Sequence, residues 1–182
     1  VIGHRTFGWT FVGSDTDATA LAAARAIVQA NGLGKAIELR AQKAPAILDG
    51  LLRKGESFAL SVCNPPFHHS PGEAQAGSRR KWTNLGYVQR GKPALNFGGH
   101  GGELWCEGGE VAFVRRMIDE SAAIPASCVW FTTLVSRSSS LPSILSALKQ
   151  VPVRDHRVIP MAQGQKQSRI VAWTFLDEGQ RA

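Results

Sequence analysis

A short apolar alternation that runs directly into two prolines constrains the fold of this chain more than any other feature. Phe58, Leu60 and Val62 alternate with small residues at the period of a β-strand. The strand cannot continue through Pro65 and Pro66, because proline lacks the N–H that a sheet ladder needs and keeps the preceding residue out of the helical region. The sequence therefore predicts a buried strand that ends in a rigid, extended loop.

The residues of this loop, Asn64-Pro65-Pro66-Phe67, suit one kind of ligand. Asn64 offers a side-chain oxygen, Pro65 a backbone carbonyl and Phe67 a flat ring. Two acceptors can each take one hydrogen of an exocyclic amine and draw its nitrogen toward tetrahedral geometry. A planar nucleobase that carries such an amine could stack on the Phe67 ring, a contact that contributes roughly 1–3 kcal/mol of binding free energy. Positioning and fixed dipoles would then supply most of the catalysis without a strong base.

The alternative is that this tetrapeptide is only a turn. Its context favours a site, because it follows a strand in a chain of alternating strands and helices. Ligands of open α/β sheets bind at the carboxyl ends of strands.

Hydrophobic periodicity predicts an α/β fold for the whole chain, mostly a parallel sheet with an antiparallel edge hairpin. The predicted strands are 9–12, 36–40, 56–62, 128–135, 156–159 and 170–175, and the predicted helices are 17–31, 45–54, 110–121 and 141–148. We expect a single domain over 1–182 with an insertion at 68–102. A nucleotide-binding α/β domain normally opens with a strand, a Gly-rich turn and a helix. We expect this first strand and its Gly-rich loop to be missing.

Composition limits the class of protein. A chain of 182 residues that is 43% hydrophobic is long enough for one substantial core. Its net charge of +7 suits a polyanionic partner. Three cysteines without CxxC spacing indicate reduced thiols rather than disulfides or a zinc site. No apolar run approaches the roughly 20 residues of a membrane span, so we expect a cytoplasmic protein.

A long polar stretch follows the proline loop. From His68 to Pro93 it combines Arg79, Arg80 and Lys81 with interleaved aromatic residues. Cations with aromatics can hold phosphates and stack unpaired bases, which favours contact with RNA. The alternative is a solvated, mobile insertion. Its adjacent histidines have no partners at ligand spacing, so no metal is expected.

An acidic residue ends the first predicted strand. Asp15 stands where acidic side chains of dinucleotide folds accept hydrogen bonds from a ribose diol. The alternative is an N-cap for the helix that follows, a role that Asp17 can also fill. We expect both roles, with Asp17 as the cap and Asp15 as the ligand.

Basic residues also lie near the ends of later strands. Arg137 follows the strand 128–135 at its carboxyl end, where the cleft is expected, and we expect it to contact RNA. Lys166 and Arg169 lie between the last two strands. These two side chains either bind RNA phosphate or occupy an exposed turn.

The tetrapeptide Asn64-Pro65-Pro66-Phe67 resembles a motif of S-adenosylmethionine-dependent amino-methyltransferases, in which Asn or Asp precedes two prolines and an aromatic residue. The resemblance runs from about Phe7 to the end of the chain and is specific to the ribosomal RNA large subunit methyltransferase F family, 23S rRNA adenine-N6 methyltransferases. It rests on the blocks CNPPFH at 63–68, EAQAGSRRK at 73–81, LNFGG at 95–99, ELWCEGGEVAF at 103–113, WFTTLVSR at 130–137 and MAQGQKQSR at 161–169.

This resemblance implies a class I methyltransferase fold, S-adenosylmethionine as the cofactor and a monomer acting on 23S rRNA or on a ribosome assembly intermediate. It implies catalytic roles for Asn64, Pro65, Pro66 and Phe67, and cofactor contacts from Asp15, Gln42, Ala44 and Asn64. The target adenine would be unpaired or flipped out of its helix. Two alternatives stay open: the same chemistry on DNA adenine or protein glutamine, and a non-catalytic RNA-binding module.

Overall fold

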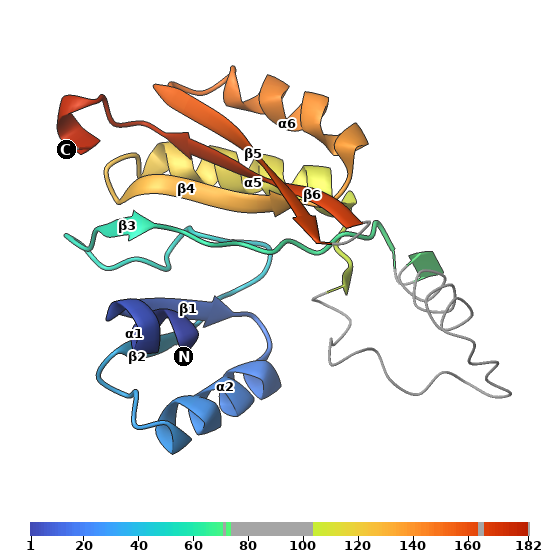
Figure 1. Cartoon of the computed structure of the whole chain (residues 1–182). Coiled ribbons are helices and arrows are strands. Elements are labelled where there is room, and N and C mark those ends of the chain that lie inside the picture. The colour runs from blue at the N-terminus through green and yellow to red at the C-terminus, as the bar shows by residue number, and fades with distance from the viewer. Residues whose placement is uncertain (71, 74–103, 164–165, 182) are drawn as a thin grey trace, which may run out of the picture. The chain divides into compact units, whose positions relative to one another are not determined.

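The structure is a computed structural model that describes residues 1–70, 72–73, 104–163 and 166–181. It divides into two compact units, residues 1–54 and 55–182. Figure 1 shows the elements of both units in chain order. Each unit is considered by itself below, and the prediction of a single domain stays a prediction.

The first unit contains two parallel strands and a capped helix. Its elements are α1 (Ile2–Phe7), β1 (Phe11–Asp15), α2 (Ala18–Ala30) and β2 (Ile37–Ala41). β1 and β2 pair in parallel from Phe11 opposite Ile37 to Asp15 opposite Ala41. Both strands therefore end at the same edge, which places the residues that follow them side by side.

Helix α2 forms because its ends are capped and one of its faces is apolar. The Asp17 side chain accepts a hydrogen bond from the Thr19 N–H at 2.7 Å, the expected N-cap contact. Leu21 and Val28 are buried one above the other along the helix. Gly32 ends it at φ +66°, a left-handed conformation that favours glycine. The prediction of this helix and of its Asp17 cap is confirmed.

Two predictions for the first unit differ from the structure. The segment 45–54 is a loop rather than a helix. Gly50 has a φ of +68°, and the Leu51 carbonyl accepts a hydrogen bond from the Arg40 guanidinium at 3.0 Å. The Gln42 side chain, just after β2, donates to the carbonyls of Ile47 and Asp49, which a helix over 45–54 would use for its own hydrogen bonds. Helix α1, in turn, was not predicted, because six residues carry too little periodicity.

The second unit is a four-stranded sheet with two main helices. Its elements are β3 (Phe58–Leu60), α5 (Gly109–Ala123), β4 (Cys128–Val135), α6 (Leu141–Leu148), β5 (Asp155–Gln163) and β6 (Lys166–Thr174), with short 3-10 turns at Ser138–Ser140 and Gly179–Arg181. The strand order is β3-β4-β6-β5. β3 and β4 are parallel, whereas β4–β6 and β5–β6 are antiparallel. The predicted antiparallel hairpin at the edge of the sheet is confirmed.

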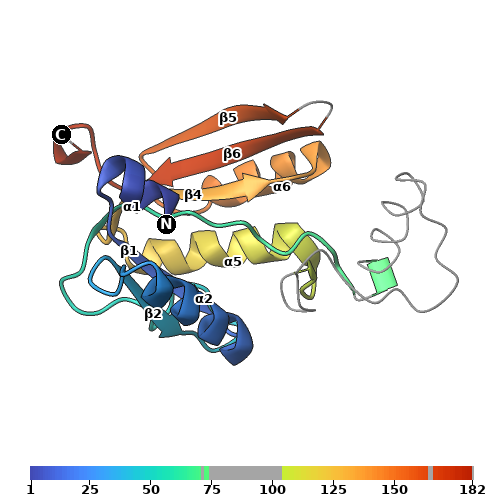
Figure 2. The ribbon, with the colours of Figure 1, turned by 60° about the horizontal axis from the view of Figure 1, so that its bottom comes forward.

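The core of the second unit lies between the sheet and helices α5 and α6 (Figure 2). Phe131 and Trp173 stack with ring centroids 6.0 Å apart, and Trp173 has no exposed surface. The Trp173 indole N–H donates to the Ser121 hydroxyl of α5 at 2.9 Å. Burial of each such large side chain contributes about 1.5–3 kcal/mol. This core fixes α5 against the sheet, and α5 carries residues of the candidate site.

The edge strands of this sheet are more exposed than the sequence indicates. In β3, Leu60 is 42% exposed, and just after the strand Val62 is 80% exposed, so the prediction of a buried strand is wrong. The reason is position: β3 is an end strand, with a partner on one side only within its unit. β5 is the other end strand, and Pro160 lies within it.

No helix in the described part of the chain is both long and apolar enough to cross a membrane.

Candidate functional site

The chain stays paired to β4 after β3 ends, which carries the Asn64–Phe67 loop to the carboxyl end of the parallel pair. The Ser61 N–H donates to the Trp130 carbonyl, and the Leu134 N–H donates to the Cys63 carbonyl, each at 2.9 Å. Cys63 forms a parallel bridge with Thr133. The loop that starts at Asn64 therefore lies at the carboxyl end of the parallel strands, where ligands of α/β folds bind.

Within this loop the two prolines are buried, and the two acceptors form no hydrogen bond with a described residue. Pro65 and Pro66 are buried, whereas Asn64 is exposed and Phe67 is half-buried. Neither the Asn64 side chain nor the Pro65 carbonyl takes part in a hydrogen bond with any described residue. Neither oxygen would have to break a hydrogen bond with a described residue to bind a ligand; Asn64 is exposed, whereas Pro65 is less than 2% exposed, so its carbonyl would have to be uncovered first.

The Cys63 thiol, just before the loop, is not a reactive nucleophile at physiological pH. Burial raises the pKa of Cys63 to about 11, against a contribution from Thr133 that lowers it. The side chain is therefore a neutral thiol at physiological pH, and thiolate chemistry is not expected from it.

Glu73 connects the exit of this loop to the end of β4. Its Oε2 accepts the His69 N–H at 2.8 Å, and its Oε1 accepts the Arg137 guanidinium at 2.7 Å. The His69 N–H, and then Arg137, hold the pKa of Glu73 at about 2. The carboxylate is therefore ionised at neutral pH. His68 Nδ1 lies 3.8 Å from the same carboxylate, too far for a hydrogen bond.

A second carboxylate, Glu110, lies beneath the same strand end. It is only 2% exposed, in the first turn of α5. Its Oε1 accepts the Ser136 N–H at 2.6 Å, and its Oε2 lies 3.4 Å from the Arg137 nitrogen. A glutamate in the first turn of a helix is favoured by the positive end of the helix, and the sequence indicates no more than this local role for Glu110. The contact with β4 could not be read from the sequence, because the two segments lie 26 residues apart.

Tight packing places His69 against the start of α5. A Cβ atom added at Gly109 would lie 2.8 Å from His69 Nδ1. Gly109 also has a φ of +63°, which disfavours any other residue. The backbone of His68 is held as well, since its N–H donates to the Leu104 carbonyl at 3.1 Å. The segment that leaves the loop is thus fixed at several points.

The cofactor residues expected in the first unit lie together at the ends of β1 and β2. The Gln42 N–H donates to the Asp15 carbonyl at 2.9 Å. Asp15 Oδ1 accepts the Asp17 N–H at 2.8 Å, whereas Oδ2 accepts no hydrogen bond from a described residue. One carboxylate oxygen at the end of a parallel strand fits a ribose diol.

Gln42 fits a direct cofactor contact less well. Its Nε2 donates to the carbonyls of Ile47 and Asp49, at 3.2 and 2.9 Å, and its Oε1 accepts the Lys43 N–H at 2.8 Å. The amide is thus engaged in shaping the loop that contains Ala44, which is exposed. The structure brings Asp15 and Gln42 together, but Asn64 belongs to the other unit.

The predicted RNA-binding residues fall into three groups. Arg79, Arg80 and Lys81 lie outside the described residues. Arg137 is paired with Glu73. In β6, the Lys166 backbone pairs with Gln163, and the Arg169 Nη1 is buried without a partner among the described residues. An unpaired buried guanidinium nitrogen is costly unless an acceptor reaches it.

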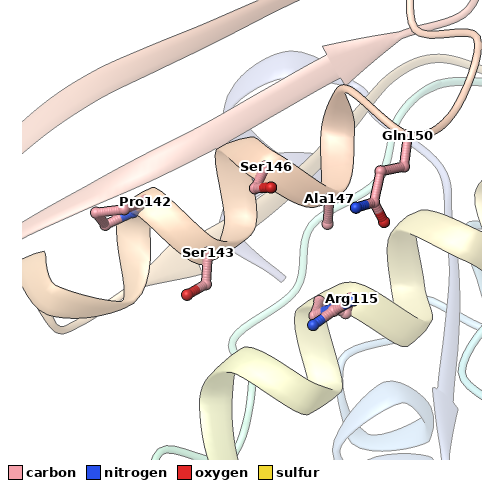
Figure 3. Close-up of a pocket in the computed structure, with 6 residues that line it drawn as sticks. All are labelled: Arg115, Pro142, Ser143, Ser146, Ala147 and Gln150. Carbon is pink, nitrogen blue, oxygen red and sulfur yellow. The ribbon is translucent and has the colours of Figure 1, made fainter.

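An open groove of about 330 Å³ lies between α5 and α6 (Figure 3). Its lining is mostly polar: Arg115, Pro142, Ser143, Ser146, Ala147 and Gln150. None of the predicted site residues lines it. Among the described residues, no group of three or more His, Cys, Asp or Glu side chains is arranged to hold a metal ion.

A comparison with protein families decides the class of the chain. A family model described as RNA methyltransferase matches residues 1–177. The chain belongs to this family. The family membership predicted from the proline motif and its surrounding blocks is therefore confirmed.

Sequence relatives of this chain are closely similar to it over its whole length. Ribosomal RNA large subunit methyltransferase F of Pseudomonas savastanoi pv. phaseolicola is 58% identical, over 100% of this chain and 56% of the relative. The protein of the same name from Pseudomonas putida is 56% identical, over 100% of this chain and 58% of the relative. The chain thus spans little more than half the length of these relatives.

Solved structures with the same fold are methyltransferase domains. The hMettl16 catalytic domain in complex with MAT2A 3′UTR hairpin 1 matches with a TM-score of 0.80 and 25% identity, over 97% of this chain and 59% of that one. The N-terminal domain of human METTL16 in complex with SAH matches with a TM-score of 0.70 and 20% identity, over 97% of this chain and 56% of that one. The predicted class I methyltransferase fold is confirmed.

Proposed function

We propose that the protein transfers a methyl group from S-adenosylmethionine to N6 of a specific adenine in 23S rRNA. The observation that supports this most directly is the Asn64–Phe67 loop. It ends a parallel pair, keeps two oxygens unpaired by described residues and leaves one ring partly exposed. The names of the Pseudomonas relatives and the RNA hairpin bound by the hMettl16 domain support RNA as the acceptor.

The loop would act on the adenine amino group by orientation. Asn64 Oδ1 and the Pro65 carbonyl each accept one amino hydrogen, which draws the nitrogen toward tetrahedral geometry and makes its lone pair available. Phe67 stacks on the base and fixes its angle. The two buried prolines limit the freedom of these oxygens, so little reorganisation is needed during the reaction.

The cofactor would be bound from the first unit. Bound S-adenosylmethionine supplies an electrophilic methyl group. Asp15 holds the ribose diol through Oδ2, and Gln42 shapes the adjoining loop around Ala44. After transfer the surplus amine proton passes to water, because Asn64 is exposed.

Basic residues would hold the RNA. Arg169 has a buried guanidinium nitrogen that a phosphate oxygen would satisfy. Lys166 precedes it on the same strand, and Arg79, Arg80 and Lys81 would add further phosphate contacts. We further propose that the protein is a cytoplasmic monomer and that its substrate is 23S rRNA, free or within a ribosome assembly intermediate.

The test compares Asn64→Ala, Asn64→Asp and wild type in single-turnover methyl transfer to 23S rRNA. A version that spans the length of the relatives is used beside this chain. Loss of one preorganised acceptor should slow transfer about 10²–10³-fold. Asn64→Asp keeps an acceptor and should retain more activity, while Ser143→Ala on α6 serves as a control.

The transfer rate of Asn64→Ala should fall far more than its affinity for the cofactor, because the Asp15 contact remains when the expected Asn64 contact is lost. Normal turnover by Asn64→Ala would refute the proposed mechanism. Transfer to naked DNA or to a glutamine peptide in preference to RNA would replace the substrate. Binding of RNA without binding of cofactor, in both versions, would favour a non-catalytic module.

A further inference from the structure

Glu73 lies six residues beyond Phe67 and has no place in the mechanism above. We propose that it is a positioning residue, which holds the Asn64–Phe67 loop in its working geometry through His69 and Arg137. This inference rests on the proposed function and extends it, because it names a residue that acts on the reaction without touching the substrate.

The first contact joins Glu73 to the loop itself. The carboxylate accepts the His69 N–H at 2.8 Å, and His69 is separated from Phe67 by one residue. Two residues of chain span at most about 7 Å. Fixing the His69 backbone therefore limits where the Phe67 ring can lie.

The second contact ties Glu73 to the sheet. Its other oxygen accepts the Arg137 guanidinium at 2.7 Å, just beyond the end of β4. Exposed ion pairs usually contribute little, because two long side chains must be ordered. Here Arg137 follows Ser136, whose N–H is bound at 2.6 Å by the buried Glu110 carboxylate. The backbone next to Arg137 is thus held by Glu110, independently of the contact between Arg137 and Glu73.

Independent packing supports the same segment. The His69 ring lies so close to Gly109 that a Cβ there would come within 2.8 Å of Nδ1. His68 is held by backbone hydrogen bonds to Leu104 and Cys106, each at 3.1 Å. These restraints converge on residues 68–69 and leave the acceptors of Asn64 and Pro65 unused. Such an arrangement holds a loop without blocking it.

The pairing also changes the interpretation of Arg137. The sequence predicts an RNA contact for this side chain, yet its guanidinium is engaged by a carboxylate that is ionised at neutral pH. A guanidinium bound to a carboxylate serves as a fixed point in the protein. The two roles predict different kinetics, so they can be separated by experiment.

The experiment measures Glu73→Ala, Glu73→Gln and Arg137→Ala in the version of the protein that spans the length of the relatives. The exposed Glu107→Gln, close to the same helix start, is the matched control. Single-turnover rate at saturating RNA and cofactor, KM for RNA, and hydrogen exchange of the His69 amide are determined for each. Unfolding curves confirm that every variant is folded.

For Glu73→Ala we expect the single-turnover rate to fall by about tenfold or more, because small misplacements of a reacting group are costly. KM for RNA should stay within about twofold, since the interaction lost is not one with substrate. The His69 amide should exchange faster. Glu73→Gln keeps an acceptor for that N–H and should recover part of the rate and protection. Arg137→Ala should resemble Glu73→Ala.

A Glu73→Ala rate within twofold of wild type would overturn the inference, and so would a higher KM for RNA at an unchanged rate. A higher KM for RNA with Arg137→Ala alone would assign Arg137 to phosphate instead. Wild-type protein that transfers no methyl group to any RNA would overturn the proposed function, and the positioning role with it. If only the positioning role of Glu73 is wrong, wild-type protein will still transfer methyl groups, and its single-turnover rate will still be far above that of Asn64→Ala.

Discussion

Replacement of Glu110 by alanine should destabilise the second unit, because this buried carboxylate binds the backbone at the end of β4. The hydrogen bond from the Ser136 N–H is 2.6 Å long and made to a charged acceptor. Bonds to charged groups contribute about 1.5–3 kcal/mol, and an unpaired buried N–H adds a desolvation cost. The 3.4 Å contact with the Arg137 nitrogen is long and adds little.

We therefore expect Glu110→Ala to lower the free energy of unfolding of the second unit by about 2–4 kcal/mol. Glu110→Gln retains one oxygen for Ser136 and should cost less. Glu107→Ala, an exposed neighbour, should stay within about 0.5 kcal/mol of wild type.

Native-state hydrogen exchange suits this measurement, because the chain has two compact units and a single unfolding curve would mix them. Core amides of β4 report the free energy of the second unit, and the Ser136 amide reports its own hydrogen bond. Two results together would refute the reasoning. The Ser136 amide would exchange at the wild-type rate in Glu110→Ala, and the free energy of unfolding from the β4 amides would stay within about 0.5 kcal/mol of wild type, the usual scatter of surface substitutions.

Two further predictions concern buried groups. Ser121→Ala should lower stability by about 1–3 kcal/mol, measured by the same exchange of β4 amides, because the Trp173 indole N–H loses its acceptor; β4 amides that exchange at the wild-type rate in Ser121→Ala would contradict this. Cys63 should react with iodoacetamide far more slowly than free cysteine at pH 8, because its pKa is raised to about 11 and few molecules carry the thiolate; alkylation at the rate of a free thiol would contradict this.

Periodic patterns and caps identified most of the fold. The strand at Cys128–Val135 and the helix at Leu141–Leu148 were predicted with the observed ends. Both have strong local signals, namely a continuous apolar run and a proline in the first helical turn. The final strands are longer than predicted, because the polar residues next to the hairpin turn show no alternation.

The candidate site was only partly predictable. Asn64 and Phe67 were identified by a local motif. The roles of Glu73 and Glu110 were not, since each depends on a contact across at least 26 residues of sequence with the end of β4. The cofactor contact of Gln42 stays a prediction, and the sequence did not indicate that its amide also binds the 43–49 loop. Sequence spacing indicates which groups are available but not which partner each one finds.

Pro160 has a consequence for the behaviour of the protein in concentrated solution. It lies within β5, the outer strand of the sheet, on which Val158, Ile159 and Met161 are 38%, 46% and 43% exposed. An outer strand with such side chains and an N–H group at every residue could pair with a strand of another polypeptide and begin aggregation. A proline offers no N–H to an incoming strand, and its ring obstructs close approach. The apolar side chains of β5 can thus remain exposed without making this edge of the sheet a template for aggregation.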